Sequence, residues 1–465
     1  GPLIFYILWR DDMNILGILE GSHDASLCLL QDSEIIFASQ AERHSRIKND
    51  FKLHHTQFPT SEKYLPDVTA FYEKPFRKNL RRLFSGQKWQ SAPRKCDYYF
   101  GHHECHAAAG YYTSSFDDCN ILVIDAIGEW DTISIWEAKT ERKHLGHVTH
   151  NLKKIKSWKY PYSLGLLYSA ITQSIGFKPS EEEYITMGMA AFGEPIHDLE
   201  FLLFENNHTG VSLNFKARRE DLAASVQALY ERELLKLVDM CPHENLILMG
   251  GCALNCVANS KIQGKNIWIM PCPDDAGSSL GAAALVRKRK LKWKGPYMGT
   301  SIKSAASPKE IVNELVSRKM CGVANGRAEF GPRALGNRSL LGDPRYDIKD
   351  TVNTVKRRQK FRPFAPAILE EYADEYFEGP MNEYMQFVAK AKHDYASVTH
   401  VDGTARVQVV KKDCSSILRG VLEEWYEKTG CPMLLNTSLN IKGQPIVNTW
   451  DDALEFSRET NVAVF

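Results

Sequence analysis

The sequence carries almost no net charge: 58 Lys and Arg residues stand against 57 Asp and Glu, which leaves a formal charge of +1 at pH 7. A chain so balanced has no overall field that would attract nucleic acid or a membrane surface. Long apolar runs are also missing. The N-terminal apolar stretch at 3–9 is far too short to cross a bilayer, and no small-residue cleavage site follows it. We therefore predict neither a membrane partner nor a signal peptide.

Paired cysteine motifs are absent as well. The eleven cysteines are odd in number and lie scattered, without a CxxC framework. This usage favours reduced thiols over a disulfide scaffold, and it predicts a cytoplasmic protein.

The length of 465 residues exceeds what one ordinary core holds, so we expect two or three domains. A basic stretch at 287–294 ends in Gly295 and Pro296, which suits a domain linker. We interpret its charges as a solvated face rather than a nucleic-acid site. The predicted domains are 13–296 and a smaller α/β unit at 307–465.

One pattern occurs twice in the first domain: a strand, an acidic or Gly/Ser turn, a second strand, a turn and a third strand. The strands of the two copies are expected at 14–19, 25–30 and 34–39, and at 121–124, 132–136 and near 145–148. Such a duplication is expected of the α/β fold of actin/hexokinase-like (RNase H-like) ATPases, in which the two turns face each other and hold the phosphates of a nucleotide. Two unrelated hairpins are the alternative.

Two histidines, His102 and His106, lie four residues apart ahead of small helix-forming residues. On a helix this spacing puts both imidazoles on one face, where they can bind one ion, and zinc or ferrous iron suits such ligands. Carboxylates would complete the shell. Asp125 lies at a predicted strand-to-turn junction, where a carboxylate can reach a cleft, and Asp274 and Asp275 lie between a predicted strand and a glycine-rich helix start, beside a natural phosphate site. A pair of structural histidines is the alternative.

A glycine pair, Gly250 and Gly251, follows an apolar strand at 246–249 and precedes a helical pattern. Glycines at such a point let the backbone approach a phosphate or ribose, and a helix N-terminus adds a favourable dipole. A purely structural turn is the alternative.

The second domain gathers cations among Gly and Pro residues, followed by amide and hydroxyl donors after an apolar strand at 433–435. The cations are Arg327, Arg333, Arg338, Lys356, Arg358 and Arg362, and the donors are Asn436, Ser438 and Asn440. Guanidinium groups bind phosphate and carboxylate oxygens in pairs, so the set predicts a small anionic substrate. A surface network of salt bridges is the alternative.

Eight motifs follow one another along the chain, at 22–25, 102–107, 124–130, 187–193, 250–255, 329–339, 361–366 and 435–440. In this order they resemble the nodulation-factor/tobramycin/cephamycin family of O-carbamoyltransferases. The resemblance implies a large domain like the ATPase of tRNA threonylcarbamoyladenosine synthesis. It also implies a small YrdC-like domain, similar to threonylcarbamoyl-AMP synthase.

The resemblance further implies a reaction in two steps. In the small domain, carbamoyl phosphate and ATP give carbamoyl-adenylate and pyrophosphate. In the large domain, beside a bound metal, the carbamoyl group passes to a hydroxyl acceptor and AMP leaves. The implied cofactors are ATP with Mg²⁺ and a divalent metal, for which Fe²⁺ is expected first and Zn²⁺ or Mn²⁺ are alternatives.

Site residues follow from motif position. The metal ligands are His102, His106, Asp125 and Asp275. Nucleotide contacts fall on Gly128, Glu129, Glu183, Gly250, Gly251, Asn255, Arg327, Asn436, Ser438 and Asn440. Catalysis falls on His23, Asp24, Arg333, Arg338, Lys356, Arg358 and Arg362. A histidine near its ordinary pKa of about 6.5 can take the proton of the acceptor, so His23 is the predicted base, with a stiffened turn as the alternative.

The acceptor is left open between a natural-product hydroxyl and a hydroxymethylated nucleobase, free or in DNA. Nucleic acid enters only as that acceptor, and a homodimer is one alternative for the assembly. The chain departs from the family pattern at Ile185, where a Lys is usual, and at Gln359, where a Glu is usual. Two rival functions remain: a sugar or acetate kinase of the same ATPase superfamily, and a non-catalytic binding module on that fold.

Overall fold

The computed structural model describes residues 12–142, 148–213 and 215–465, which form two compact units. The first unit consists of the chain up to Ala41 and of Asn49–Trp293. The second consists of Lys294–Phe465 and of the short segment Glu42–Lys48, which the sequence had grouped with the first domain. The apolar stretch 3–9 and residues 145–147 of the strand expected near 145–148 lie outside the described residues. The third strand of the second copy is Val148–Lys159, so its expected position was wrong.

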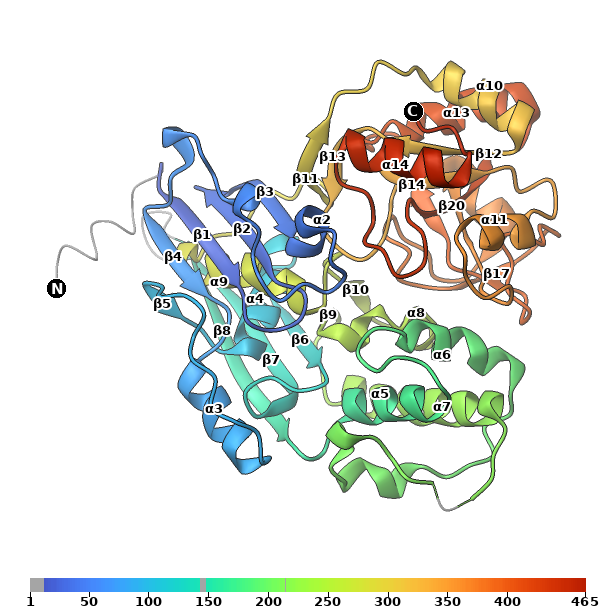
Figure 1. The fold of residues 1–465 in the computed structure, drawn as a ribbon. Helices are drawn as coiled ribbons and strands as arrows, with labels where there is room; N and C mark the ends of the chain where they lie inside the picture. The colour runs from blue at the N-terminus through green and yellow to red at the C-terminus, as the bar shows by residue number, and fades with distance from the viewer. Residues whose placement is uncertain (1–11, 143–147, 214) are drawn as a thin grey trace. The chain divides into compact units, whose positions relative to one another are not determined.

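The first sheet of the first unit contains the first copy of the repeated pattern (Figure 1). Its strands are β1 (Asn14–Leu19), β2 (Ser26–Gln31), β3 (Glu34–Gln40), β4 (Val68–Phe71) and β5 (Tyr98–Tyr99), in the order β3-β2-β1-β4-β5. β1 pairs with β2 and β2 with β3 in antiparallel fashion, whereas β4 runs parallel to β1 and to β5. The three strands expected here are confirmed to within one residue.

The second sheet repeats the first, strand for strand. Its strands are β6 (Cys119–Ile124), β7 (Asp131–Arg142), β8 (Val148–Lys159), β9 (Asn245–Met249) and β10 (Asn266–Trp268), in the order β10-β9-β6-β7-β8. β6, β7 and β8 are antiparallel neighbours, and β9 is parallel to β6 and to β10. Both sheets therefore have the same topology, and the predicted mixed α/β fold with a duplicated ATPase-like unit is confirmed.

Two helices, one from each copy of the repeat, each pack against the sheet of the other copy. α4 (His102–Thr113) follows the first sheet but packs against β6 and β9, whereas α9 (Ser278–Arg287) follows the second sheet and packs against β1, β2 and β4. The two helices also pack on each other, and small residues permit a close approach. A Cβ atom at Gly281 would lie only 1.9 Å from the backbone oxygen of Cys105.

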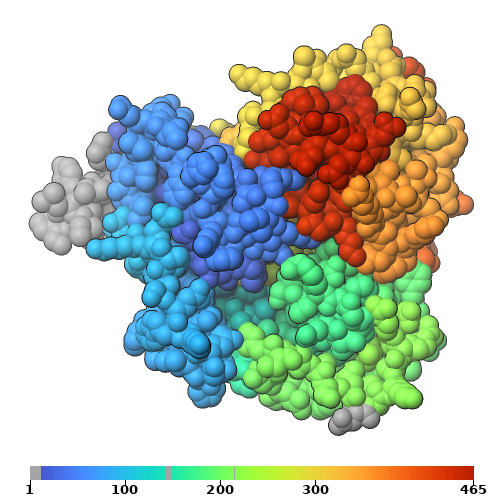
Figure 2. Space-filling view, viewed as in Figure 1, coloured from blue at the N-terminus to red at the C-terminus, as the bar shows by residue number. Residues whose placement is uncertain are grey.

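The other helices of the first unit lie in the connections between strands. They are α3 (Pro75–Phe84), α5 (Leu164–Ser174), α6 (Glu183–Met189), α7 (Arg219–Asp239) and α8 (Cys256–Asn259), and α7 packs against both α5 and α6. The surface of this unit is hollowed between the part built around α3 and the green part that contains α5 to α7 (Figure 2).

The second unit is a separate α/β body with its own core. A five-stranded sheet has the order β12-β14-β20-β15-β19, with strands Met320–Ala324, Arg338–Gly342, Met433–Ser438, Ala365–Leu369 and Gln408–Val410. One smaller sheet pairs β11 (Tyr297–Ile302) with β13 (Gly326–Glu329). In the other, β17 (Ala389–Ala391) lies between β16 (Phe377–Glu378) and β18 (Thr404–Ala405) and pairs with both. Its helices are α2 (Ala41–Ser45), α10 (Pro308–Arg318), α11 (Lys349–Val355), α12 (Ala373–Tyr376), α13 (Leu418–Thr429) and α14 (Trp450–Thr460).

The basic stretch at the end of the first unit is a solvated face only in part: Lys288, Lys292 and Lys294 are exposed, whereas two other cations are engaged with the protein. Arg287 is buried and pairs with Asp32, and the ammonium group of Lys290 donates to the backbone oxygens of Tyr111 and Phe116 at 2.6 and 2.7 Å. Burial lowers the pKa of Lys290 to about 8. Arg287 and Lys290 therefore bind the end of α9 to its neighbours.

The cysteines fit the expectation of reduced thiols, since all eleven are free. In the described part of the chain, no helix combines the length and the apolar character that crossing a bilayer requires.

Candidate active site

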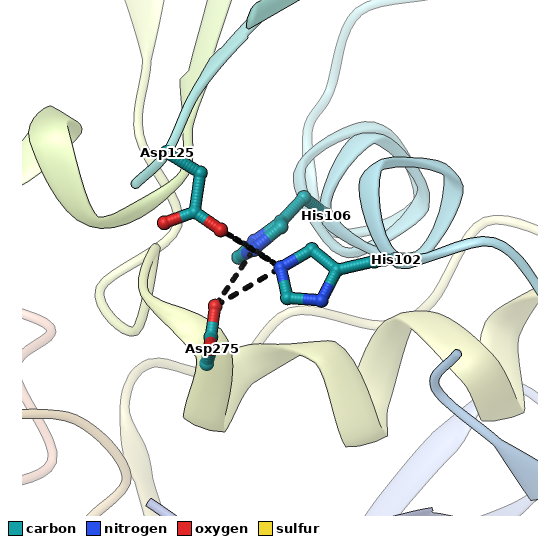
Figure 3. Close-up of side chains that lie close together, drawn as sticks. All are labelled: His102, His106, Asp125 and Asp275. Carbon is teal, nitrogen blue, oxygen red and sulfur yellow. Dashed lines mark hydrogen bonds and ion pairs between the residues drawn. The ribbon is translucent and has the colours of Figure 1, made fainter. Parts of the chain in front are cut away.

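Four side chains from three separate segments converge inside the first unit (Figure 3). His102 and His106 lie on one face of the first turns of α4. Asp125 follows the end of β6 directly, and Asp275 begins the short turn of 3₁₀ helix that leads into α9. All four residues are buried, and one ligand atom from each lies within 4.8 Å of the others.

The distances within this cluster fit a single bound ion. The Nε2 atoms of His102 and His106 are 3.2 Å apart, and both face Asp275 Oδ1, at 3.1 and 3.2 Å. Asp125 Oδ2 lies 2.8 Å from His102 Nε2 and 3.6 Å from His106 Nε2. A tetrahedral ion with ligand bonds of about 2.0–2.2 Å separates its ligand atoms by about 3.3–3.6 Å, close to this set. Two imidazoles and two carboxylates thus lie close enough together to hold one metal ion.

The electrostatics of the cluster favour the same conclusion. Burial alone would lower the pKa of His102, but the carboxylates of Asp275 and Asp125 raise it well above its ordinary value. Burial would also lower the pKa of His106, but hydrogen bonds to the same two carboxylates raise it. Burial alone would raise the pKa of Asp125, yet hydrogen bonds with His102 and His106 hold it well below its usual range. Two anionic carboxylates are therefore balanced by protons on the imidazoles, and a divalent cation could replace those protons without a change in net charge.

A neighbouring carboxylate fixes the start of α4. Glu129, in the turn after β6, accepts hydrogen bonds from the backbone N–H of His102 at 3.2 Å and of Lys74 at 2.8 Å. It therefore caps α4 at the first ligand, and the negative charge suits a helix N-terminus. Gly128 packs against the same helix, since a Cβ there would lie 3.2 Å from the Cβ of His102. The nucleotide contacts predicted for Gly128 and Glu129 stay predictions. In the structure both residues contact α4.

His23 and Asp24 lie beside the cluster. The Nδ1 atom of His23 is 2.8 Å from Asp24 Oδ2, and its Nε2 atom is 3.9 Å from Asp275 Oδ2. The side chain is half exposed, at 51%. Desolvation lowers the pKa of His23, but the hydrogen bond to Asp24 and the charges of Asp275 and Asp125 raise it above its ordinary value.

Two other ionisable neighbours stay outside the four-atom cluster. His103 faces away, with its Nδ1 atom 2.7 Å from the hydroxyl of Ser134, and burial together with the nearby histidines His102 and His106 lowers its pKa. Asp274 lies next to the ligand Asp275, and burial and the charge of Asp24 raise its pKa to about 7.

One residue at this site was missed by the sequence reasoning. The ring of Tyr72 lies 5.5 Å from that of His102, and the pKa of its hydroxyl is raised by burial and by the charges of Glu73 and Asp275. Tyr72 follows the end of β4 directly, and an apolar run that ends at a polar aromatic residue was the available signal.

The glycine pair after β9 borders the cluster, but its two members differ. Gly250 has φ 90° and ψ 162°, a conformation open essentially to glycine alone, and a Cβ there would lie 2.1 Å from the backbone oxygen of Ile124. Gly251 faces Asp125, and a Cβ there would lie 3.7 Å from Oδ1, which is an ordinary contact. The fold thus requires the first glycine whether or not a nucleotide binds.

This difference predicts a contrast between two variants. Gly250→Ala is expected to lower the free energy of unfolding by more than about 2 kcal/mol, because backbone strain adds to the clash with Ile124. Gly251→Ala, one residue further on, is expected to change it by less than about 1 kcal/mol. Urea unfolding without added nucleotide measures both, and equal losses would show that the conformation of Gly250 is not the cause.

The remaining predicted contacts of the first unit are engaged in local structure. Glu183 accepts a hydrogen bond from the hydroxyl of Ser169 on α5. Asn255 caps α8 by accepting from the N–H of Ala258 at 3.0 Å, and its amide donates to Gln227 at 2.9 Å. Their nucleotide roles stay predictions. Ile185, the departure from the family pattern, is buried in α6.

In the second unit, the structure brings together Lys356, Ser438 and Asn440. The buried ammonium group of Lys356 donates to the backbone oxygen of Asn440 and to its side-chain oxygen, both at 3.0 Å, and to the backbone oxygen of Ser438. Its pKa lies well below the usual range, first because of burial and then because of the positive charges of Arg358, Arg362 and Lys48. Like charges gathered in this way favour binding of an anion.

Lys48 was not predicted as part of this set. It belongs to the segment Glu42–Lys48, which is remote in sequence from the other cations but is part of the second unit. No sequence pattern indicated that membership.

Arg338 is committed to backbone groups of its own unit. Its buried guanidinium donates to the backbone oxygens of five residues: Asn448, Asn325, Gly326, Asn337 and Thr300. Burial lowers its pKa to about 10. Its catalytic role stays a prediction, and a substrate would have to compete with these carbonyls.

Glu329 organises the loop that carries the predicted arginines. One carboxylate oxygen accepts from the N–H groups of Leu335 and Asn337, at 2.8 and 2.9 Å. The guanidinium of Arg327 donates to the backbone oxygen of Met298 at 2.5 Å. Arg333 lies in this loop, and its role stays a prediction.

Two other predicted residues of the second unit have polar contacts within it. Arg358 donates to the side-chain oxygen of Asn353 at 2.6 Å. Asn436 donates to Gln408 at 2.7 Å, and its own side-chain oxygen is buried without a hydrogen-bond partner in the described chain. The side-chain oxygen of Gln359, the second departure from the family pattern, is likewise buried and unpartnered there.

Comparison with known proteins shows the family to which the chain belongs. The model "Carbamoyltransferase N-terminus" matches residues 68–209 and 196–284, and "Carbamoyltransferase C-terminus" matches residues 312–465. Nodulation protein NolO of Bradyrhizobium diazoefficiens is 30% identical, over 76% of this chain and 75% of its own length. The chain belongs to the carbamoyltransferase family. The family resemblance seen in the motifs is thereby confirmed.

Other relatives of this carbamoyltransferase span nearly the whole chain. An uncharacterized protein of Synechocystis sp. is 30% identical over 95% of this chain and 93% of its own length. Nodulation protein NolNO of Sinorhizobium fredii is 29% identical over 93% of this chain and 76% of its own length.

Among solved structures, component A of (R)-2-hydroxyglutaryl-CoA dehydratase from Acidaminococcus fermentans is 13% identical. It covers 59% of this chain and 98% of its own, with a TM-score of 0.35. HypF of T. kodakarensis is 12% identical over 59% and 48% of the two chains, with a TM-score of 0.34. Scores this low support no argument about function.

Proposed function

We propose that this carbamoyltransferase uses carbamoyl phosphate and ATP to make carbamoyl-adenylate, and then transfers the carbamoyl group to a hydroxyl of an acceptor. Membership of the carbamoyltransferase family supports group transfer in general. The observation that carries the finer proposal is the convergence of two histidines and two aspartates on one point of the first unit, together with a separate cluster of cations in the second.

We assign the first step to the second unit and take it as YrdC-like. Carbamoyl phosphate loses its phosphate to water and gives carbamate, whose oxygen attacks the α-phosphorus of ATP and displaces pyrophosphate. Both substrates are polyanions, so they need positive charge where they meet. Lys356 with Arg358, Arg362 and Lys48 provides such charge. Ser438 and Asn440, which accept hydrogen bonds from Lys356, fix the position of its ammonium group.

The second step is assigned to the first unit. His102, His106, Asp125 and Asp275 would hold a divalent metal, which supplies positive charge to an oxygen that becomes more negative during transfer. Fe²⁺ is proposed as the resident ion, with Zn²⁺ or Mn²⁺ as alternatives, because imidazole with carboxylate suits all three. ATP would bring its own Mg²⁺.

His23 is proposed to take the proton from the attacking hydroxyl. With Nδ1 directed to Asp24, its Nε2 atom is the one left to accept a proton. The carboxylates around it hold its pKa above the ordinary value, so His23 keeps a proton at neutral pH in their presence alone. A cation held by Asp125 and Asp275 would offset their negative charge. It would thereby lower the pKa of His23, so that the imidazole could act as a base.

The products distinguish this proposal from its rivals. Incubation with ATP, Mg²⁺ and carbamoyl phosphate is expected to release pyrophosphate, and the completed reaction is expected to leave AMP. A kinase of the same fold would instead leave ADP without any need for carbamoyl phosphate, and a binding module would leave ATP intact. Chromatography of the nucleotides, with and without carbamoyl phosphate, decides among the three. The acceptor would then be found by a screen of hydroxylated compounds with labelled carbamoyl phosphate.

A further inference from the structure

The helix α3 of the first unit has its polar side buried and its apolar side exposed. Asn79 and Arg81 are the buried residues of this helix. The exposed residues include four large apolar side chains at helical spacing, among them Phe76, 64% exposed, and Phe84, 72% exposed. The other two are Leu80 and Leu83, and the exposed Trp89 packs edge-on against Phe76. In soluble domains a helix normally turns such a stripe inward, so this orientation requires an explanation.

Polar contacts hold α3 in this orientation. The amide of Asn79 donates to the backbone oxygen of Gln90, and the N–H of Gln90 donates back to Asn79, both at 2.8 Å. Arg81 donates to the backbone oxygen of Glu129 at 3.2 Å, and Lys78 pairs with Glu73 at 2.7 Å. The buried face is therefore satisfied, and a rotation of the helix to bury the apolar stripe would break all of these contacts.

The same part of the chain carries a concentration of positive charge. Residues 74–95 include eight Lys and Arg residues and no Asp or Glu, in a chain whose total charge is only +1. Among them Arg77, Lys88 and Lys95 are exposed. The overall charge balance, which led us to expect no membrane partner, conceals this local excess.

We propose that α3 and Trp89 form a docking surface for an anionic lipid membrane. An amphipathic helix with Phe, Leu and Trp on one side and Lys and Arg beside them can lie in the headgroup region, with its apolar side chains among the acyl chains. Each cation near such a surface adds attraction to anionic lipid. The part of the surface built around α3 projects as a lobe, a shape that can reach a flat partner (Figure 2).

Two other occupants fit less well. A symmetric contact with a second copy of the chain would set two segments of eight cations and no acid against each other. A single-stranded nucleic acid needs cations and stacking rings on the outward face, whereas the aliphatic residues Leu80 and Leu83 occupy much of that face.

Vesicle sedimentation tests the proposal. The full chain is expected to sediment with vesicles of equal parts phosphatidylglycerol and phosphatidylcholine, and to bind vesicles of phosphatidylcholine alone about tenfold more weakly. The double variant Leu80→Gln/Phe84→Gln should lose about tenfold in binding, and Arg77→Gln/Lys88→Gln should lose a similar amount together with most of the salt dependence. Val401→Gln, which removes an exposed apolar side chain from the second unit, is the matched control and should bind normally.

Several results would overturn the proposal. One is equal binding to both vesicle types, or no binding to either. Another is a wild-type dimer in light scattering that Leu80→Gln/Phe84→Gln converts to a monomer, which would make this face an interface between copies. A third is tight binding of a 30-nucleotide DNA strand that the same variant abolishes. Carbamoyl-phosphate-dependent pyrophosphate release should be unchanged in all these variants, so failure of the docking proposal can be told from failure of the proposed reaction.

Discussion

Replacement of His106 by alanine is expected to remove the bound metal and to lower carbamoyl transfer by about 10³-fold or more. His106 is completely buried, and its Nε2 atom faces both His102 and Asp275 at 3.2 Å. Without that nitrogen, three ligands remain around a space that the imidazole had closed, and a tetrahedral ion loses a quarter of its shell. Metal analysis of the purified variant, with its rate of AMP release from supplied carbamoyl-adenylate, measures the two effects together.

His103 provides the matched control because it is a buried histidine on the same helix. Its Nδ1 atom contacts Ser134 and takes no part in the four-residue cluster. His103→Gln is therefore expected to keep one metal per chain and most of the activity. If His106→Ala retained its metal and turnover, or if both variants lost them equally, the assignment of the cluster would be wrong.

The duplicated architecture could be predicted because its signals are local. Apolar runs of strand length between polar turns gave the positions of β1, β2 and β3 to within one residue. The orientation of α3 could not be predicted in this way. Its sequence has an amphipathic pattern, and the rule that the apolar face is buried would have turned Phe76 and Phe84 inward. The contacts of Asn79 and Arg81 with groups outside the helix decided otherwise.

The residues of the candidate site, too, could be predicted from the sequence only in part. His102 and His106 could be paired from their spacing, and the family motifs supplied Asp125 and Asp275, which no local pattern connects with them. Residues with several kinds of partner were harder to interpret. A guanidinium can donate to backbone carbonyls as well as to phosphates, so the sequence could not reveal that Arg338 is occupied by five carbonyls.

The assignment of the first step to the second unit predicts a clean separation of the two half-reactions. Lys356 is buried beside Ser438 and Asn440, and the neighbouring cations Arg358 and Arg362 depress its pKa after the effect of burial. An anion bound there would reverse this effect and gain from every cation in the cluster. The cluster should therefore matter to steps that involve carbamoyl phosphate and ATP, and to no step that begins from carbamoyl-adenylate.

Lys356→Met is accordingly expected to lower carbamoyl-phosphate-dependent pyrophosphate release by about 10²-fold or more, because a methionine keeps the length of the side chain and removes its charge. AMP release from supplied carbamoyl-adenylate, with water or the acceptor as nucleophile, should stay near the wild-type rate. Because Lys356 also donates hydrogen bonds to Ser438 and Asn440, Arg362→Met serves as a second variant that leaves those contacts in place. Lys390, an exposed cation on β17, provides the control variant Lys390→Met. Urea unfolding shows whether each variant is folded. Loss of both half-reactions in folded Arg362→Met, with its metal still bound, would show that the two units do not divide the chemistry in this way.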